Sequence, residues 1–108
     1  MYAPGILWTS AHHRIPLLSI MHNNRGWHQE LMHVQRMADR HNRGINRATI
    51  GTTITSPEID YAKLAQSMGV HADGPITSPN DLGPAIRRAI EVVEKGEPAL
   101  VDVVTQPR

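Results

Sequence analysis

The sequence predicts an α/β protein in which a parallel sheet is flanked by helices. Apolar runs at residues 17–21 and 98–104 have the nearly continuous hydrophobic character of strands that are covered on both faces. These runs alternate with longer segments that have helical periodicity, and such alternation is typical of a parallel sheet. The length of 108 residues and the hydrophobic content of 40% suit a single domain over 1–108 with a modest core.

The first two predicted elements are a short helix and a strand. Residues 3–14 are expected to be helical, because Pro4 is tolerated in a first turn and the basic end at residues 12–14 suits the negative end of the helix dipole. The two adjacent histidines at that end would point to different sides of a helix, so they form a poor metal chelate. The apolar run 17–21 follows and is predicted to be a central strand.

Two adjacent amides, Asn23 and Asn24, come directly after this strand. Ligands of open parallel sheets bind beyond the carboxyl ends of the strands, so these carboxamides lie at a position where a cofactor or metal could bind. The alternative is a plain turn, because asparagine bonds to nearby backbone and tolerates positive φ. Spacing alone favours the turn, and both interpretations of the Asn23 and Asn24 pair stay open at this point.

The middle of the chain is predicted to contain one helix and one long loop. A helix is expected over 27–41, and a narrow apolar stripe runs along it: Leu31, Val34 and Ala38. Its histidines, among them His28 and His33, are acid–base candidates because histidine titrates near neutrality, but the sequence assigns none of them a catalytic role. Residues 42–56 are rich in Gly, Asn and Thr and are predicted to be an ordered loop that contributes to the site or to a subunit contact.

The next helix is predicted from its start and stop signals. Ser56 is the expected N-cap, Pro57 fits the first helical position, and Gly69 ends the helix. Acidic residues in the first turn suit the positive end of the helix dipole. A short strand over 70–72 should follow.

The last helix repeats the same signals. Ser78 is the expected N-cap, Pro79 the first helical residue and Gly96 the terminator. Its apolar face consists of Leu82, Ala85, Ile86, Ala89, Ile90 and Val93. On the polar side, Arg87 and Glu91 have the spacing of an i, i+4 ion pair.

Composition and charge narrow the function classes. The 11 basic and 10 acidic residues nearly balance, and no nucleic-acid motif accompanies the arginines between residues 36 and 47, so we expect no nucleic-acid partner. With no cysteine there is no disulfide framework and no thiolate site, which suits the cytoplasm. No apolar run approaches the roughly 20 residues of a membrane helix, and the N-terminus lacks the pattern of a secretory signal. A cytoplasmic protein with no membrane contact is expected.

Several separated blocks, in a fixed order, carry a resemblance to a known family. They are Leu7-Trp8-Thr9-Ser10-Ala11, Ile15-Pro16 before the apolar strand, Asn23-Asn24 with Trp27, Asp60-Tyr61-Ala62-Lys63-Leu64-Ala65 with Gly69, and Pro98-Ala99-Leu100-Val101-Asp102-Val103. Together they resemble the C-terminal cofactor-binding domain of thiamine-diphosphate-dependent enzymes of the acetolactate synthase and decarboxylase group. The resemblance covers almost the whole chain.

The resemblance implies a cofactor, thiamine diphosphate, and a Mg²⁺ ion that bridges its diphosphate. Asn24 matches the residue whose side-chain oxygen binds the metal, and Gly26 matches the residue that offers its main-chain carbonyl. Magnesium prefers such oxygen ligands and completes its shell with phosphate and water. The family's Gly-Asp-Gly motif, which lies on an earlier strand and supplies an acidic ligand, does not occur in this sequence. The expectation is therefore a partial domain, truncated at its N-terminus and without the first strand.

The resemblance also implies an activity and partners. Such enzymes make or break carbon–carbon bonds next to the carbonyl of a 2-oxo acid, and the glutamate that activates the cofactor belongs to a pyrimidine-binding domain of the same or another subunit. We therefore expect a homo-oligomer, and no activity from the chain alone. The competing hypothesis is a non-catalytic α/β assembly module, whose unpaired sheet edge recruits another chain.

Overall fold

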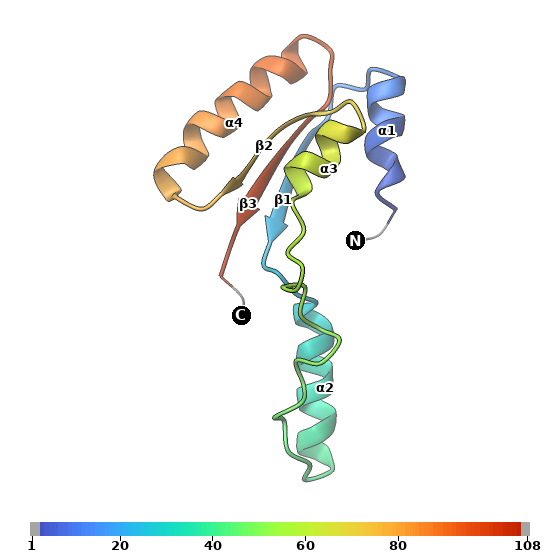
Figure 1. Ribbon diagram of the computed structural model, residues 1–108, viewed down its shortest axis with the longest axis vertical. Helices are drawn as coiled ribbons and strands as arrows, with labels where there is room; N and C mark the ends of the chain where they lie inside the picture. Colours follow the sequence, from blue (N-terminus) through green and yellow to red (C-terminus); the bar gives the residue numbers. More distant parts are fainter. Residues whose placement is uncertain (1–2, 107–108) are drawn as a thin grey trace. The chain divides into compact units, whose positions relative to one another are not determined.

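The computed structural model describes residues 3–106 (Figure 1). Its elements, in chain order, are α1 (Gly5–His12), β1 (Leu18–Asn23), α2 (His28–Arg40), α3 (Tyr61–Ser67), β2 (His71–Ile76), α4 (Pro79–Glu94) and β3 (Ala99–Val104). The chain divides into two compact units: a sheet unit, formed by residues up to 23 together with 60–104, and an α2 unit that contains residues 24–59. The elements confirm the predicted α/β class.

The sheet unit contains a three-stranded parallel sheet in the order β1-β3-β2. The last strand in the chain, β3, is therefore the central one. Its first four residues are buried, and because side chains alternate across a strand, Ala99 and Val101 face one side while Leu100 and Asp102 face the other. The predicted buried strand over 98–104 is confirmed.

Helices cover both faces of this sheet (Figure 1). On one face, Ala85 and Ala89 of α4 pack against Ala99 and Val101. The opposite core cluster joins α3 and the sheet: Ala62, Ala65, Val70, Ala72 and Leu100, with Leu7 and Ala11 of α1 packed against it. Alanine dominates both helix–sheet contacts, so the helices approach the strands closely and little of the core is aromatic.

The prediction that the run 17–21 forms a central strand is wrong. Within residues 3–106, β1 pairs with β3 alone and lies at the edge of the sheet. The apolar run is accordingly not covered on both faces, since Ile20 of β1 is 49% exposed and Leu17, just before the strand, is 45% exposed. A continuous apolar run indicates a strand but does not specify how many neighbours the strand has.

The predicted start of α3 is also wrong. The helix begins at Tyr61 with Asp60 as its N-cap, not at Ser56 and Pro57. The reason is that Asp60 accepts a hydrogen bond from the backbone N–H of Lys63 at 2.8 Å, which satisfies a free donor of the first turn. Gly69, with φ of 82°, ends the helix as predicted, and the following strand β2 extends beyond the expected 70–72 to Ile76.

The bounds of α4 confirm the prediction, although two of its side-chain assignments change. Pro79 is the first residue of the helix and Ser78 its N-cap, but the Ser78 side chain makes no capping hydrogen bond. Among the described residues, Arg87 and Glu91 do not form the predicted ion pair; Arg88 instead binds Asp73 of β2 at 3.0 Å. Ile90, expected on the buried face, is exposed.

The α2 unit has a different character. The helix α2 confirms the prediction for 27–41, but none of its residues is buried, so the predicted apolar stripe lacks cover within this unit. The segment 42–56 is irregular, as predicted, and consists of turns with a single backbone bridge. Of the helices described in residues 3–106, none has the length and hydropathy needed to cross a membrane.

Candidate functional site

Asn24 comes directly after the carboxyl end of β1, as predicted, because the strand ends at Asn23. The Asn24 side-chain oxygen accepts a hydrogen bond from the backbone N–H of Gly26 at 3.2 Å, and Arg25 between them has φ of 57°. The turn interpretation therefore describes the local backbone correctly. It leaves room for a ligand, because an amide oxygen has two lone pairs and this hydrogen bond uses one.

Gly26 joins this turn to the loop that follows α2. It forms an isolated antiparallel bridge with Thr53. Two backbone hydrogen bonds accompany the bridge, from Trp27 N to Thr52 O at 2.7 Å and from Ile54 N to Arg25 O at 2.8 Å. A Cβ atom at Gly26 would lie 3.0 Å from the Thr52 carbonyl oxygen, a tight contact, so the close approach of the two backbones favours glycine here. The sequence did not reveal this pairing, because the loop has no strand pattern.

A small cavity of about 50 Å³ adjoins the turn. It is lined by Asn24, Arg25, Gly26, Trp27, His28, Leu31, Thr52 and Thr53. The Nδ1 atom of His28 is buried and has no hydrogen-bond partner within residues 3–106. The volume suits only one or two oxygen-sized groups. The structure thus brings both predicted ligand residues and one of the candidate histidines to the same cavity, and adds two threonines that the sequence did not single out.

The donor set is compatible with Mg²⁺ that already carries phosphate. Asn24 offers a side-chain oxygen and Gly26 a main-chain carbonyl oxygen, and no hydrogen bond to the Gly26 carbonyl is found in the described part of the chain. Residues 3–106 contain no group of three His, Cys, Asp or Glu side chains that could hold a metal ion. Two neutral oxygens fit an ion whose remaining ligands are phosphate oxygens and water, and they do not fit an all-protein cage.

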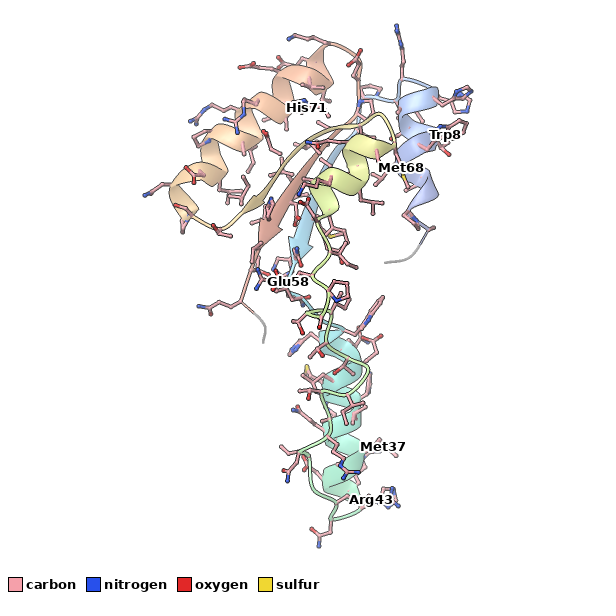
Figure 2. All side chains as sticks on the ribbon, in the orientation of Figure 1. Trp8, Met37, Arg43, Glu58, Met68 and His71 are labelled. Atoms are coloured by element: carbon pink, nitrogen blue, oxygen red, sulfur yellow. The ribbon has the colours of Figure 1, made fainter. Side chains whose placement is uncertain are left out.

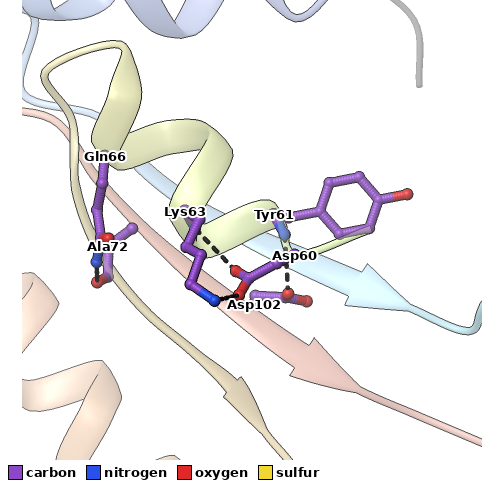
Figure 3. Close-up of polar contacts among 6 residues, drawn as sticks. All are labelled: Asp60, Tyr61, Lys63, Gln66, Ala72 and Asp102. Atoms are coloured by element: carbon purple, nitrogen blue, oxygen red, sulfur yellow. Dashed lines mark hydrogen bonds and ion pairs between the residues drawn. The ribbon is translucent and has the colours of Figure 1, made fainter. Parts of the chain in front are cut away.

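A second polar cluster, in the sheet unit, anchors the start of α3 (Figure 3). Asp102, fully buried on the central strand, accepts a hydrogen bond from the Tyr61 backbone N–H at 3.3 Å. Burial, together with the negative charge of Asp102, raises the pKa of the Tyr61 phenol. Gln66 donates from its side-chain amide to the Ala72 carbonyl at 2.9 Å and so ties α3 to β2. This cluster positions a helix. The strand that contains Asp102 was predicted to be buried, but the sequence assigned no role to Asp102 itself.

Tyr61 also lines an apolar cavity of about 230 Å³ in the sheet unit. Its other lining residues come from α1 and the two residues before it, and from β1, α3 and β3. They are mostly aliphatic, among them Leu7, Met21, Leu64 and Leu100. A further cavity of about 470 Å³, in the α2 unit, is lined by seven residues that include His33, His41 and Arg43. Figure 2 shows the side chains of Met37 and Arg43 in this segment. Neither cavity contains a predicted ligand residue.

The adjacent histidines of the first helix make ring contacts. His12 stacks on Trp8 with ring centroids 4.8 Å apart, and His13 meets His12 edge to face at 4.7 Å. His12 is exposed, and this ring contact occupies one face of its imidazole.

Comparison with protein families decides the assignment. The family described as thiamine pyrophosphate enzyme, C-terminal TPP binding domain, matches residues 1–103. The chain belongs to this family. Thiamine pyrophosphate is another name for thiamine diphosphate, so the resemblance carried by the sequence blocks is confirmed, and with it the fold class of a thiamine-diphosphate-binding domain. Comparisons with curated proteins and with solved structures give no significant match.

Family membership indicates which kind of ligand the residues around the Asn24 turn should be compared with. A thiamine-diphosphate-binding domain must hold a diphosphate, and diphosphates in proteins are commonly held together with a divalent cation and backbone donors. The turn after β1 offers oxygens for a cation, and His28, whose Nδ1 atom is buried, lines the adjoining cavity. The residues present therefore fit the group in chemical type.

Proposed function

We propose that this chain holds the diphosphate of thiamine diphosphate through Mg²⁺, with the side-chain oxygen of Asn24 and the main-chain carbonyl of Gly26 as the protein ligands. We further propose that it forms the C-terminal part of an acetolactate synthase-like or 2-oxo acid decarboxylase-like enzyme. When bound, the cofactor supplies the nucleophile and the electron sink for making or breaking a bond next to a carbonyl. The chain's own residues bind and orient it.

One observation carries the proposal: the Asn24–Gly26 turn comes directly after a parallel strand, and both residues line one cavity. The 3.2 Å hydrogen bond fixes the Asn24 amide, so its oxygen needs no reorganisation to accept a cation on the second lone pair. The bridge to Thr53 holds Gly26 in place in the same way. A preorganised pair of oxygens of this kind is what a phosphate-bound Mg²⁺ needs from a protein.

We propose that the chain alone binds the cofactor weakly and is inactive. Its sequence has no Gly-Asp-Gly motif, and the described residues offer no acidic cluster that could replace the missing carboxylate. Without a carboxylate, the protein's share of the metal ligands is neutral, which lowers the affinity for a divalent cation. The activating glutamate would come from a pyrimidine-binding domain of the same or another subunit.

The proposal is tested by titrating the ¹⁵N-labelled chain with thiamine diphosphate, with and without Mg²⁺, and following its backbone amides by NMR. We expect weak, metal-dependent shifts concentrated at residues 24–28. Asn24→Ala should weaken metal-dependent binding at least about tenfold (~1.4 kcal/mol), because it removes one of two protein oxygens. Asn24→Asp should strengthen it, because a carboxylate adds the negative charge that the donor set lacks.

Asn80→Ala is the matched control. Asn80 is an exposed residue of α4, so this variant removes an asparagine without touching the turn. Shifts confined to other residues, or unaffected by Asn24→Ala, would refute the assignment of the site. Tight binding by the unaltered chain in calorimetry would refute the proposal that its metal site is incomplete.

The second candidate function, an assembly module, is favoured by the edge of the sheet. Within the described residues β1 has no strand on its other side, and the exposed Leu17 and Ile20 flank that edge. An edge strand without charged residues is a template for pairing with another chain. A homo-oligomer would also suit a cofactor site shared between subunits. A defined oligomer in sedimentation, without any cofactor affinity, would favour the assembly module over the cofactor-binding domain.

A further inference from the structure

We propose that His28 is a further cofactor-binding residue, and that its Nδ1–H donates a hydrogen bond to an anionic phosphate oxygen of the diphosphate beside Asn24 and Gly26. This inference rests on the proposed function and deepens it, because it concerns the same cavity. It assigns a role to a histidine that sequence reasoning left without one.

The first argument is the burial of the Nδ1 atom. It is shielded from solvent, yet it makes no hydrogen bond to any atom of residues 3–106. Buried polar atoms in folded proteins are nearly always paired, with protein, water or ligand, because an unpaired one loses its hydration without compensation. Because His28 lines the small cavity beside Asn24 and Gly26, a ligand or water molecule in this cavity is the candidate partner of Nδ1.

The second argument is the position of His28. It is the first residue of α2, which spans 13 residues, and its N-cap Trp27 makes no side-chain capping hydrogen bond. The first backbone N–H groups of the helix therefore lack a side-chain acceptor, and the helix dipole favours negative charge at this end. Glu30, an acidic residue of the first turn, would repel a second negative charge at this end. It is exposed, so solvent and salt screen this repulsion.

The third argument is the division of donors and acceptors around the cavity. Asn24 and Gly26 contribute oxygens, which suit a cation, whereas His28 contributes a nitrogen that can carry a proton. A metal-bound phosphate presents both partners at once, since the cation meets the oxygens and a free phosphate oxygen meets the N–H donor. The volume of about 50 Å³ admits such an oxygen and excludes either ring of the cofactor.

The test observes the imidazole nitrogens directly. Long-range ¹H–¹⁵N spectra of the full chain are recorded at one fixed pH, first with Mg²⁺ and inorganic pyrophosphate and then with Mg²⁺ and thiamine diphosphate. We expect the Nδ1 resonance of His28 to move on addition of either ligand and to show a bound proton. The resonances of His33, an exposed residue of the same helix, should stay in place.

Three variants locate the donor on the ring. His28→Asn keeps an amide N–H close to the position of Nδ1, and we expect affinity within about threefold of the unaltered chain. His28→Gln places its amide nearer the position of Nε2, and His28→Leu has no donor, so both should weaken binding at least about tenfold. His33→Gln is the control and should change nothing. Circular dichroism of each variant checks that α2 persists.

The outcomes separate this inference from the proposed function. If the amides of residues 24–27 move but the His28 ring does not, water pairs Nδ1, the His28 assignment is overturned and the proposed function stands. Equal losses for His28→Asn and His28→Gln would likewise overturn the assignment to Nδ1. If no resonance in 24–28 responds to either ligand, both the cofactor site and the role of His28 are refuted.

Discussion

The sheet unit and the α2 unit differ in the interactions that stabilise each of them internally. In the sheet unit, β3 is buried on both faces and the alanines of α3 and α4 pack directly against it. In the α2 unit, helix α2 has no buried residue, and a few backbone hydrogen bonds around the Asn24 turn fix the local geometry. Burial thus stabilises the first, whereas hydrogen bonding shapes the second.

This difference implies that the residues that determine the stability of the fold and the residues proposed to bind the cofactor lie in different parts of the chain. The residues that we assign to the cofactor, Asn24, Gly26 and His28, all belong to the less buried unit. Segments that bind ligands are commonly drawn from the less stable parts of a protein, because they must adjust to the ligand. Substitutions in the sheet unit should therefore change the free energy of unfolding, and substitutions around the turn should change binding with little effect on unfolding.

The largest effect is expected from Gly74→Ala in β2. Gly74 has φ of 135°, and an added Cβ would lie 2.7 Å from the Asp102 carbonyl oxygen and 2.8 Å from the Asp102 Cβ atom. Backbone strain and a clash with the central strand should together lower the free energy of unfolding by about 3 kcal/mol or more. Gly44→Ala, in the α2 unit, meets no atom within 4 Å and should stay within about 0.5 kcal/mol. Urea unfolding followed by circular dichroism measures both.

The same valine-to-alanine substitution, made once in each unit, compares the two units more directly. Val101 is completely buried on β3, so Val101→Ala should cost about 2 kcal/mol through lost burial and the cavity left behind. Val34 lies on α2 and is 45% exposed, so Val34→Ala should change the free energy of unfolding by less than about 0.5 kcal/mol. Equal costs in the same unfolding assay would mean that a second chain covers the apolar side of α2 in solution.

The sequence predicted elements best where local signals and burial agree. Pro79 and Gly96 bracket α4 as expected, because the fixed φ of proline and the freedom of glycine act without reference to the rest of the chain. The start of α3 was mispredicted at Ser56 and Pro57, because Asp60 caps the helix and Asp102, more than 40 residues away in the chain, binds its first N–H. No local pattern reports such a long-range contact.

In the candidate site, too, local sequence patterns suggested some residues, whereas others are brought there only by contacts between distant parts of the chain. The sequence suggested Asn24 through its place after an apolar strand and through the family resemblance, and it suggested Gly26 through the resemblance alone. It did not identify Thr52 and Thr53, since their approach to the turn depends on how the loop folds back on Gly26. The burial of His28 Nδ1 is likewise not marked by any local sequence pattern, so the sequence left this histidine without a role.

The smallest expected effect concerns pH and the first turn of α3. The backbone N–H of Lys63, followed by the Lys63 side chain, holds the pKa of Asp60 below its usual value of 3.8. Because the folded-state pKa is lowered, the charged carboxylate favours the folded state. Its contribution is complete above the unfolded-state value and is lost as pH falls through the lower folded-state pKa.

Asp60→Asn keeps a capping oxygen but removes this titration. Between pH 6 and pH 3, the unaltered chain should therefore lose more stability than Asp60→Asn, by no more than about 0.5 kcal/mol because the pair is solvent-screened. Asp81→Asn is the control, since the Asp81 side chain makes no hydrogen bond within residues 3–106. Amide hydrogen exchange should localise the extra loss to α3. An equal response of the α2 amides would show that the two units do not open independently, and the contrast between them would then describe their packing and not their stability.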